Sequence, residues 1–252
     1  MILKCLGSSS SGNCYLLDSK TECLVLEAGV KFSEVKKALD FNIGKLVGVV
    51  ASHSHKDHFG HAEEYLKAGI PVYAPEETHK SLSRKYLNQV VVKPYKHGDK
   101  PYEIGSFKIY PFPAEHDVEC FGYVISHPEM GNVIFATDTS FVRQNFKGIK
   151  PNHILIEANY SEAIINDLLS KGLIDQARVN RTFRTHMSIE TCKEFVRANK
   201  TASLDSVMLL HLSDGNSNAE QFRREILDAA GNDVRVTVAD RGMEVKLDLF
   251  PW

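Results

Sequence analysis

Short apolar runs rich in β-branched side chains recur along the whole chain, and polar turns separate them. Runs of this length and composition are typical of β-strands. The predicted strands occupy residues 2–6, 14–18, 23–28, 46–52, 71–74, 90–93, 107–112, 123–126, 133–137, 154–158, 206–212, 234–239 and 244–249. The pattern therefore indicates a protein with strands from one end of the chain to the other.

Between these runs, apolar residues recur at helical spacing, often behind a residue that can cap a helix. The predicted helices are residues 34–39 behind a Ser33 cap, 59–68, a first turn at Glu76 and Glu77, 161–172, a helix that Ser188 opens, and a helix to Ala229 that Ser217 and Glu220 open with a capping box. The first half of the chain is rich in hairpin-like strands, whereas the second half alternates strand and helix. This order predicts two sheets covered by helices, an α/β protein, in a single domain over residues 1–252.

Composition excludes several classes of protein. The net charge of -2 gives no bulk attraction to nucleic acid or to an anionic membrane, so any phosphate contact must come from a local patch. The N-terminal run is too short and too soon polar for a signal peptide or a membrane span, which predicts a cytoplasmic protein with no membrane partner. The five cysteines form no C-x-x-C pair, which argues against a disulfide framework or a cysteine-based zinc site.

One stretch concentrates metal-binding chemistry. The segment "VVASHSHKDHFGH" carries His53, His55, Asp57 and His58 directly after an apolar strand. An extended segment points His53 and His55 the same way, whereas a helix would not, so these two are expected to serve one metal and Asp57 with His58 a neighbouring one. Nitrogen and oxygen donors without a thiolate suit Zn(II) or another divalent first-row ion. His61 lies outside this pattern and is not expected to bind.

The motif "HSHKDH" resembles the H-x-H-x-D-H signature of the metallo-β-lactamase fold superfamily. Later strand ends supply matching residues in the same order: His116 in "PAEHD", Asp138 in "FATDTS" and His211 in "LLHLS". The resemblance covers nearly the whole chain and implies a four-layer αββα sandwich.

The resemblance also implies a site with two metal ions. By that likeness His53, His55 and His116 hold one ion, Asp57, His58 and His211 hold the second, and Asp138 bridges them. Zn is the expected metal, and Mn or Fe also suits these ligands. The implied reaction is hydrolysis by a metal-bound hydroxide, which Asp57 could orient.

Three residues indicate which reaction is catalysed and which bond is cleaved. The oxygen-reducing branch of the superfamily resembles H-x-E-x-D-H, with a carboxylate at the second ligand position. This chain has His55 at that position, and this favours hydrolysis. Glu157 at a strand end and His186 before a helix resemble the pair with which tRNase Z-type phosphodiesterases protonate the leaving group. The alternative is a structural role for Glu157, as a cap or a salt-bridge partner, and a surface position for His186.

A basic run and a serine-rich turn are candidate substrate contacts. Arg178, Arg181 and Arg184 lie in a stretch without acidic residues, and Arg181 and Arg184 are expected to bind phosphate. Ser10, in the turn at 8–13, could do the same through its hydroxyl. A solvated charged face and a plain β-turn are the respective alternatives.

The segments "LGSSSSGNCYLL", "EHDVECFGYVI" and "HMSIET" are most similar to the YycJ (WalJ) group of this superfamily, which resembles DNA exonucleases; Met187 departs mildly from that pattern. The implied partner is nucleic acid, DNA rather than RNA, or a small phosphodiester. Residues 117–137 leave no space for a tRNA-gripping arm. The alternatives are a hydrolase of esters, thioesters or lactones, an RNA-processing nuclease, and a catalytically silent binding protein, which the complete ligand set disfavours.

Overall fold

The structure is a computed structural model that describes residues 1–249. Its strands are β1 (Ile2–Ser9), β2 (Gly12–Asp18), β3 (Cys23–Leu26), β4 (Leu46–Val50), β5 (Val72–Ala74), β6 (Gln89–Val91), β7 (Tyr102–Ile104), β8 (Phe107–Ala114), β9 (Cys120–His127), β10 (Gly131–Ala136), β11 (His153–Glu157), β12 (Ser206–Leu210), β13 (Arg235–Val238) and β14 (Glu244–Lys246). Its helices are α1 (Phe32–Ala38), α2 (Lys56–Phe59), α3 (Ala62–Lys67), α4 (Glu76–Lys80), α5 (Glu162–Ser170), α6 (Gln176–Thr185), α7 (Ile189–Asn199) and α8 (Ala219–Ala230), with 3-10 turns at Ile43–Lys45 and Lys147–Ile149. None of these helices is long and apolar enough to cross a membrane.

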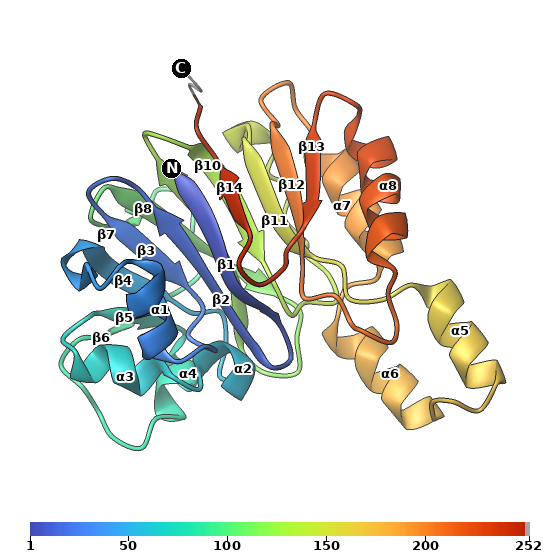
Figure 1. Cartoon of the computed structure of the whole chain (residues 1–252), viewed down its shortest axis with the longest axis horizontal. Coiled ribbons are helices and arrows are strands. Elements are labelled where there is room, and N and C mark those ends of the chain that lie inside the picture. The colour runs from blue at the N-terminus through green and yellow to red at the C-terminus, as the bar shows by residue number, and fades with distance from the viewer. Residues whose placement is uncertain (250–252) are drawn as a thin grey trace. The chain divides into compact units, whose positions relative to one another are not determined.

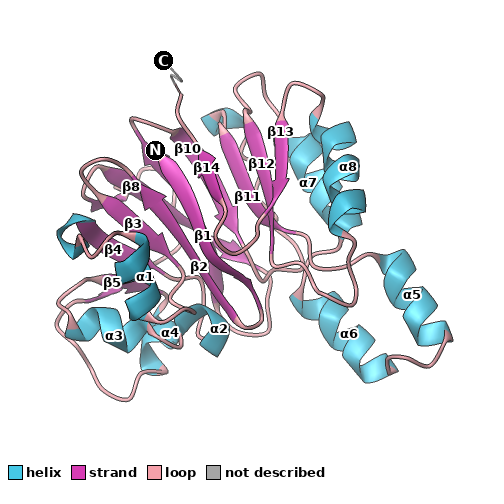
Figure 2. Ribbon diagram, viewed as in Figure 1, coloured by secondary structure: helices cyan, strands magenta, loops and turns pink. Residues whose placement is uncertain are grey.

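The chain divides into two compact units. The first holds Met1–Phe112, Val118–Gly131 and the described residues from Asp240 onward, and the second holds Pro113–Asp117 and Asn132–Ala239. The strands form two seven-stranded sheets, in the orders β14-β1-β2-β3-β4-β5-β6 and β13-β12-β11-β10-β9-β8-β7. Helices accompany both sheets (Figure 2), so the predicted α/β class with two mixed sheets is confirmed.

The first sheet changes direction partway across. Strands β14, β1, β2 and β3 pair antiparallel, as expected for hairpins, but β3 through β6 pair parallel. Parallel neighbours need a crossover connection, and α1, α2 with α3, and α4 provide the three crossovers. Apolar side chains of α1 and α3, such as Val35 and Tyr65, pack with strand residues such as Leu16 and Val49 in one buried core.

The second unit is built from parallel strands. β10, β11, β12 and β13 pair parallel in that order. Helices α7 and α8 lie side by side against these strands, whereas α5 and α6 form a separate pair beyond the strand ends (Figure 1). Because all four strands run the same way, the residues that follow β10, β11 and β12 collect at one edge of the sheet.

Several predicted boundaries differ from the structure. The helix expected over residues 59–68 is two helices, because the His61 amide donates to the carbonyl of Ala28 at 2.9 Å instead of continuing the first helix. Asn218, not Ser217, caps α8, and its side chain accepts from the Gln221 amide at 3.0 Å. Helix α1 begins at Phe32, behind Lys31, so Ser33 lies inside the helix and does not cap it.

Candidate functional site

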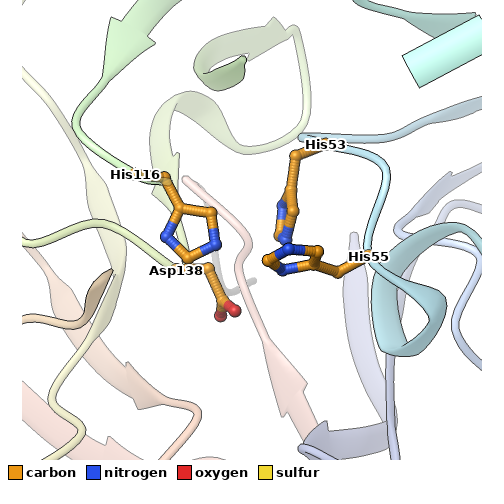
Figure 3. Close-up of side chains that lie close together, drawn as sticks. All are labelled: His53, His55, His116 and Asp138. Carbon is orange, nitrogen blue, oxygen red and sulfur yellow. The ribbon is translucent and has the colours of Figure 1, made fainter. Parts of the chain in front are cut away.

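In the first unit, two imidazoles follow β4. His53 is fully buried, and its ring lies 4.6 Å from that of His55, centroid to centroid (Figure 3). His53 Nδ1 lies 2.8 Å from the hydroxyl of Ser52. The extended backbone after β4 therefore places both rings side by side, as the alternating pattern predicts.

Asp57 and His58 lie on the short helix α2. His58 is fully buried, and its Nε2 lies 3.3 Å from Asp57 Oδ2 and accepts from the Asn13 amide at 2.9 Å. The His53 and His58 rings are 4.3 Å apart, centroid to centroid. The first unit thus brings all four predicted ligands of the "HSHKDH" motif together.

Glu27 is a buried carboxylate that the sequence analysis did not select. It directly follows β3, has a φ of 66°, and accepts from the Ser52 amide at 3.1 and 3.3 Å. Its Oε2 lies 3.5 Å from His58 Nδ1, so Glu27 places a buried carboxylate directly beside that ring. The available signal was an acidic residue at the end of an apolar strand in "CLVLEAG".

The loop after Glu27 packs backbone to backbone against α2. A Cβ at Gly29 would lie 1.7 Å from the carbonyl oxygen of Asp57, so only glycine fits there. The Ala28 amide donates to the carbonyl of His58 at 2.7 Å. The strand end that carries Glu27 is therefore held directly against the Asp57 and His58 backbone.

In the second unit, Asp138 and His211 follow β10 and β12. Both have left-handed backbones, with φ of 46° and 52°, although neither is glycine. Such a backbone is strained for these residues and is typical of functional sites. His211 Nδ1 lies 2.8 Å from Asp138 Oδ1 and 3.1 Å from Glu157 Oε1. The second unit therefore brings these two predicted ligands together, with Glu157 beside them.

His116 follows β8 and belongs to the second unit. Its Nδ1–H donates to the carbonyl oxygen of Thr185 at 2.9 Å, which leaves Nε2 as a possible ligand atom, 3.2 Å from Asp117 Oδ1. Burial lowers the pKa of His116, against the opposing effect of Asp138 and Asp117. Asp117 is a second acidic neighbour that the sequence analysis did not select.

Glu157 and His186 form a close pair. His186 Nδ1 lies 2.7 Å from Glu157 Oε1, and Glu157 Oε2 accepts from the amides of Thr139 at 2.9 Å and Met187 at 3.1 Å. Burial opposes both charges, but the attraction and hydrogen bond between them prevail, so the pKa of Glu157 is lowered and that of His186 is raised. This geometry contradicts a surface position for His186, whose side chain is 22% exposed.

The donor atoms of the second unit suit a divalent cation. Asp138, Glu157, His186 and His211 each offer one ligand atom, and these atoms lie within 4.8 Å of one another. Two of the four are buried carboxylates, which need a cationic partner. Burial lowers the pKa of His211, but Asp138 and Glu157 outweigh it and raise that pKa to about 10. Nitrogen and oxygen donors beside concentrated negative charge fit a first-row divalent metal.

The candidate substrate contacts lie at the surface. Arg178, Arg181 and Arg184 are exposed on α6, and none of them forms an ion pair within residues 1–249. Ser10 is exposed in the turn between β1 and β2, and Asn13 connects that turn to His58. His61, which was not expected to be a ligand, pairs through Nδ1 with Glu64 Oε1 at 2.7 Å.

Comparisons with known proteins agree with these motifs. The family model described as "Metallo-beta-lactamase superfamily" matches residues 9–239 of the chain. The exodeoxyribonuclease WalJ of Streptococcus pneumoniae is 29% identical over 179 residues, covering 64% of this chain and 63% of that protein. The exodeoxyribonuclease YycJ of Bacillus anthracis is 25% identical over 163 residues, covering 62% of this chain and 61% of that protein. The chain thus spans less than two thirds of the length of these curated relatives.

A solved structure supports the fold. The metallo-β-lactamase fold protein YhfI from Bacillus subtilis has a TM-score of 0.72 to this chain at 19% identity, and the match covers 97% of this chain and 98% of that one. At this identity the likeness concerns the fold alone. It confirms the predicted fold class, an α/β sandwich of the metallo-β-lactamase fold.

Proposed function

The chain belongs to the metallo-β-lactamase superfamily, and on this premise we propose that it is a dinuclear metal-dependent phosphodiesterase that degrades DNA as an exonuclease. The names of its relatives WalJ and YycJ support this substrate class. The pairing of Glu157 with His186 supports it independently, because it supplies a proton donor of the kind that phosphodiester cleavage needs.

In this proposal seven side chains hold the metals. His53, His55 and His116 would hold the first ion, Asp57, His58 and His211 would hold the second, and Asp138 would be shared between them. Divalent ions bound there would activate a water molecule and stabilise negative charge on the attacked phosphoryl group. Zn is the metal we propose, and Mn or Fe suits the same nitrogen and oxygen ligands.

The residues of the chain then have separate tasks. Asp57, next to His58 on α2, orients the attacking water by hydrogen bond. Arg181 and Arg184 bind phosphates of the DNA, and Ser10 donates its hydroxyl to another phosphate. Met187 has a fully buried side chain, and its amide donates to Glu157, so the departure from the related motif leaves this support intact.

The Glu157–His186 pair is the observation that carries the proposal. The Nδ1–H of His186 is held by a buried carboxylate, and within residues 1–249 its Nε2 makes no hydrogen bond. Nε2 is therefore available to donate its proton to the oxygen that leaves phosphorus. A raised pKa keeps this imidazole protonated nearer to neutral pH, as a general acid requires.

A substrate panel tests the proposal. Protein loaded separately with Zn and with Mn is mixed with end-labelled single- and double-stranded DNA, RNA and bis(p-nitrophenyl) phosphate. We expect stepwise shortening of DNA, and a loss of about 100-fold or more in kcat/KM for DNA in His186→Ala, because the leaving oxygen then departs unprotonated. The loss should be smaller for bis(p-nitrophenyl) phosphate, whose leaving group needs no proton.

Three results would contradict it. Metal-loaded protein that leaves every phosphodiester intact would reject the function. Turnover of esters, thioesters or lactones that survives His186→Ala would identify the other class of hydrolase. Fewer than one bound ion per chain, in protein never exposed to a chelator, would indicate a catalytically silent protein.

A further inference from the structure

Helices α5 and α6 form a helical hairpin between β11 and α7, and Figure 1 shows them as a pair apart from the parallel strands of the second unit. The hairpin has its own small core, in which Tyr160, Ile165 and Val179 are buried against Leu169 and Ile174. Asp175 caps α6 by accepting from the Arg178 amide at 2.8 Å. The hairpin is therefore an ordered element with its own packing, able to hold a ligand in a fixed place.

An aromatic side chain lies at the surface of this hairpin. Phe183 is 39% exposed, and its ring stacks on Tyr160 with centroids 5.2 Å apart and planes 16° from parallel. Tyr160 itself is only 5% exposed, so it supports one face of the Phe183 ring while the other side of that ring reaches solvent. A large apolar ring held flat at the surface is the arrangement on which an unpaired nucleobase stacks.

The exposed charges of α6 select an anionic ligand. Arg178, Arg181 and Arg184 are exposed on the same helix and form no ion pair within residues 1–249. Helix α8 differs, because Arg223 and Arg224 there both contact Glu220. The stretch 176–188 has no acidic residue, so the positive charge of α6 is not cancelled locally. Exposed guanidinium groups on the same helix as an exposed aromatic ring match a nucleic-acid strand, which alternates phosphates with flat bases.

Hydrogen bonds connect the C-terminal end of α6 to residues of the proposed active site. The helix ends at Thr185, whose carbonyl oxygen accepts from His116 Nδ1–H at 2.9 Å. The next residue, His186, is held by Glu157 at 2.7 Å. Phe183 is thus two and three residues from these anchored positions, and a base bound on it would have a fixed register relative to His186.

We propose that the α5–α6 hairpin binds single-stranded DNA, with Phe183 stacking on an unpaired base and Arg184, the next residue of α6, contacting a flanking phosphate. The inference rests on the proposed function and gives its substrate a strand preference. Stacking needs a base that is free of its partner, and every base offers a flat face, so the hairpin selects unpaired ends without selecting sequence.

Binding of labelled oligonucleotides to the full chain tests this proposal. Fluorescence anisotropy gives the Kd for a fluorescein-labelled oligothymidine, for the same strand with abasic sites, and for a blunt duplex of equal length. Phe183→Leu keeps an apolar contact with Tyr160 but removes the ring, and should weaken binding of the oligothymidine about tenfold. Phe183→Trp should bind like the wild type, and so should Phe41→Leu, which removes an exposed ring of the first unit.

The outcomes separate folding, binding and catalysis. Thermal unfolding of each variant shows whether it is folded, and Phe183→Trp tests the ring even where Phe183→Leu is unstable. Equal Kd values for the wild type, Phe183→Leu and abasic DNA would overturn the proposal, as would duplex binding tighter than that of the single strand. Because binding is measured without turnover, loss of the Phe183 effect is distinguishable from failure of the proposed phosphodiesterase activity.

Discussion

Glu157 serves four partners with its two oxygens. Oε1 lies near the imidazoles of His186 and His211, and Oε2 accepts the amides of Thr139 and Met187. These four contacts stabilise the charged form of a fully buried carboxylate and hold its side chain in one position. A fixed negative charge beside His186 stabilises its imidazolium form, so the protonation of His186 depends on Glu157 more directly than on solvent.

Replacement of Glu157 by glutamine should therefore alter the pH profile of DNA cleavage. The carboxylate raises the pKa of His186, so its removal lets that pKa fall and the acid form is lost at a lower pH. We expect the alkaline limb of kcat/KM to move to lower pH and activity at neutral pH to drop at least about tenfold. Steady-state kinetics across a pH series measure both effects.

Glu220→Gln is the matched control, because Glu220 is exposed and, among the described residues, its ion pairs are with Arg223 and Arg224 of its own helix. Its pH profile should equal that of the wild type. An alkaline limb that stays in place in Glu157→Gln while the rate falls would show that Glu157 does not set the protonation of His186.

At the scale of elements, local patterns predicted most strands and helices, because alternation and capping are encoded by neighbouring residues. The structure differs from these predictions where residues that are distant in sequence determine where an element ends or how a strand pairs. The helix after His58 breaks because the carbonyl of Ala28 takes the amide of His61. The parallel pairing of β3 to β6 depends on crossovers rather than on any single run of residues.

The same distinction applies to the candidate site. "HSHKDH" could be identified because its four candidate ligands lie within six residues, and His116, Asp138 and His211 were selected through their order at strand ends. Glu27 was missed because its role depends on Ser52 and His58, which are remote in sequence. Asp117 was missed because adjacency to His116 alone gives no sign that it approaches Nε2.

The cap of α8 provides a test at this scale. Asn218→Ala removes the side chain that accepts the Gln221 amide and should lower the free energy of unfolding by about 1 kcal/mol. Ser217 instead donates to the carbonyl of Ser213, so Ser217→Ala should cost less. Urea unfolding measures both variants. A larger loss in Ser217→Ala would restore Ser217 as the cap.

At the scale of the whole molecule, the proposed ligands are spread over a long stretch of chain, from His53 to His211. An unfolded chain cannot present all of them in one place, so metal binding and folding are linked. The cysteines add no comparable constraint, because all five are buried and none of them forms a disulfide within residues 1–249. Bound metal is therefore expected to be a major contributor to stability.

Removal of metal should lower the Tm. Metal at about 1,000 times its Kd stabilises the folded state by about 4 kcal/mol, and a chelator should reverse this gain. Differential scanning calorimetry with and without chelator, alongside metal analysis, measures the effect. Asp138→Asn should reduce the metal-dependent gain, whereas His61→Ala should keep it, since His61 pairs with Glu64. A Tm that chelator and added metal both leave unchanged would contradict the linkage.

The left-handed backbones of Glu27, Asp138 and His211 have a consequence for the engineering of this protein. Each conformation costs roughly 1 kcal/mol or more for a residue with a Cβ, and glycine would relieve that cost. Selection for heat resistance alone would therefore favour glycine at these three positions. The same changes would remove the proposed bridging carboxylate, a proposed ligand imidazole and the buried carboxylate next to His58, so more heat-resistant variants with glycine there are expected to be inactive.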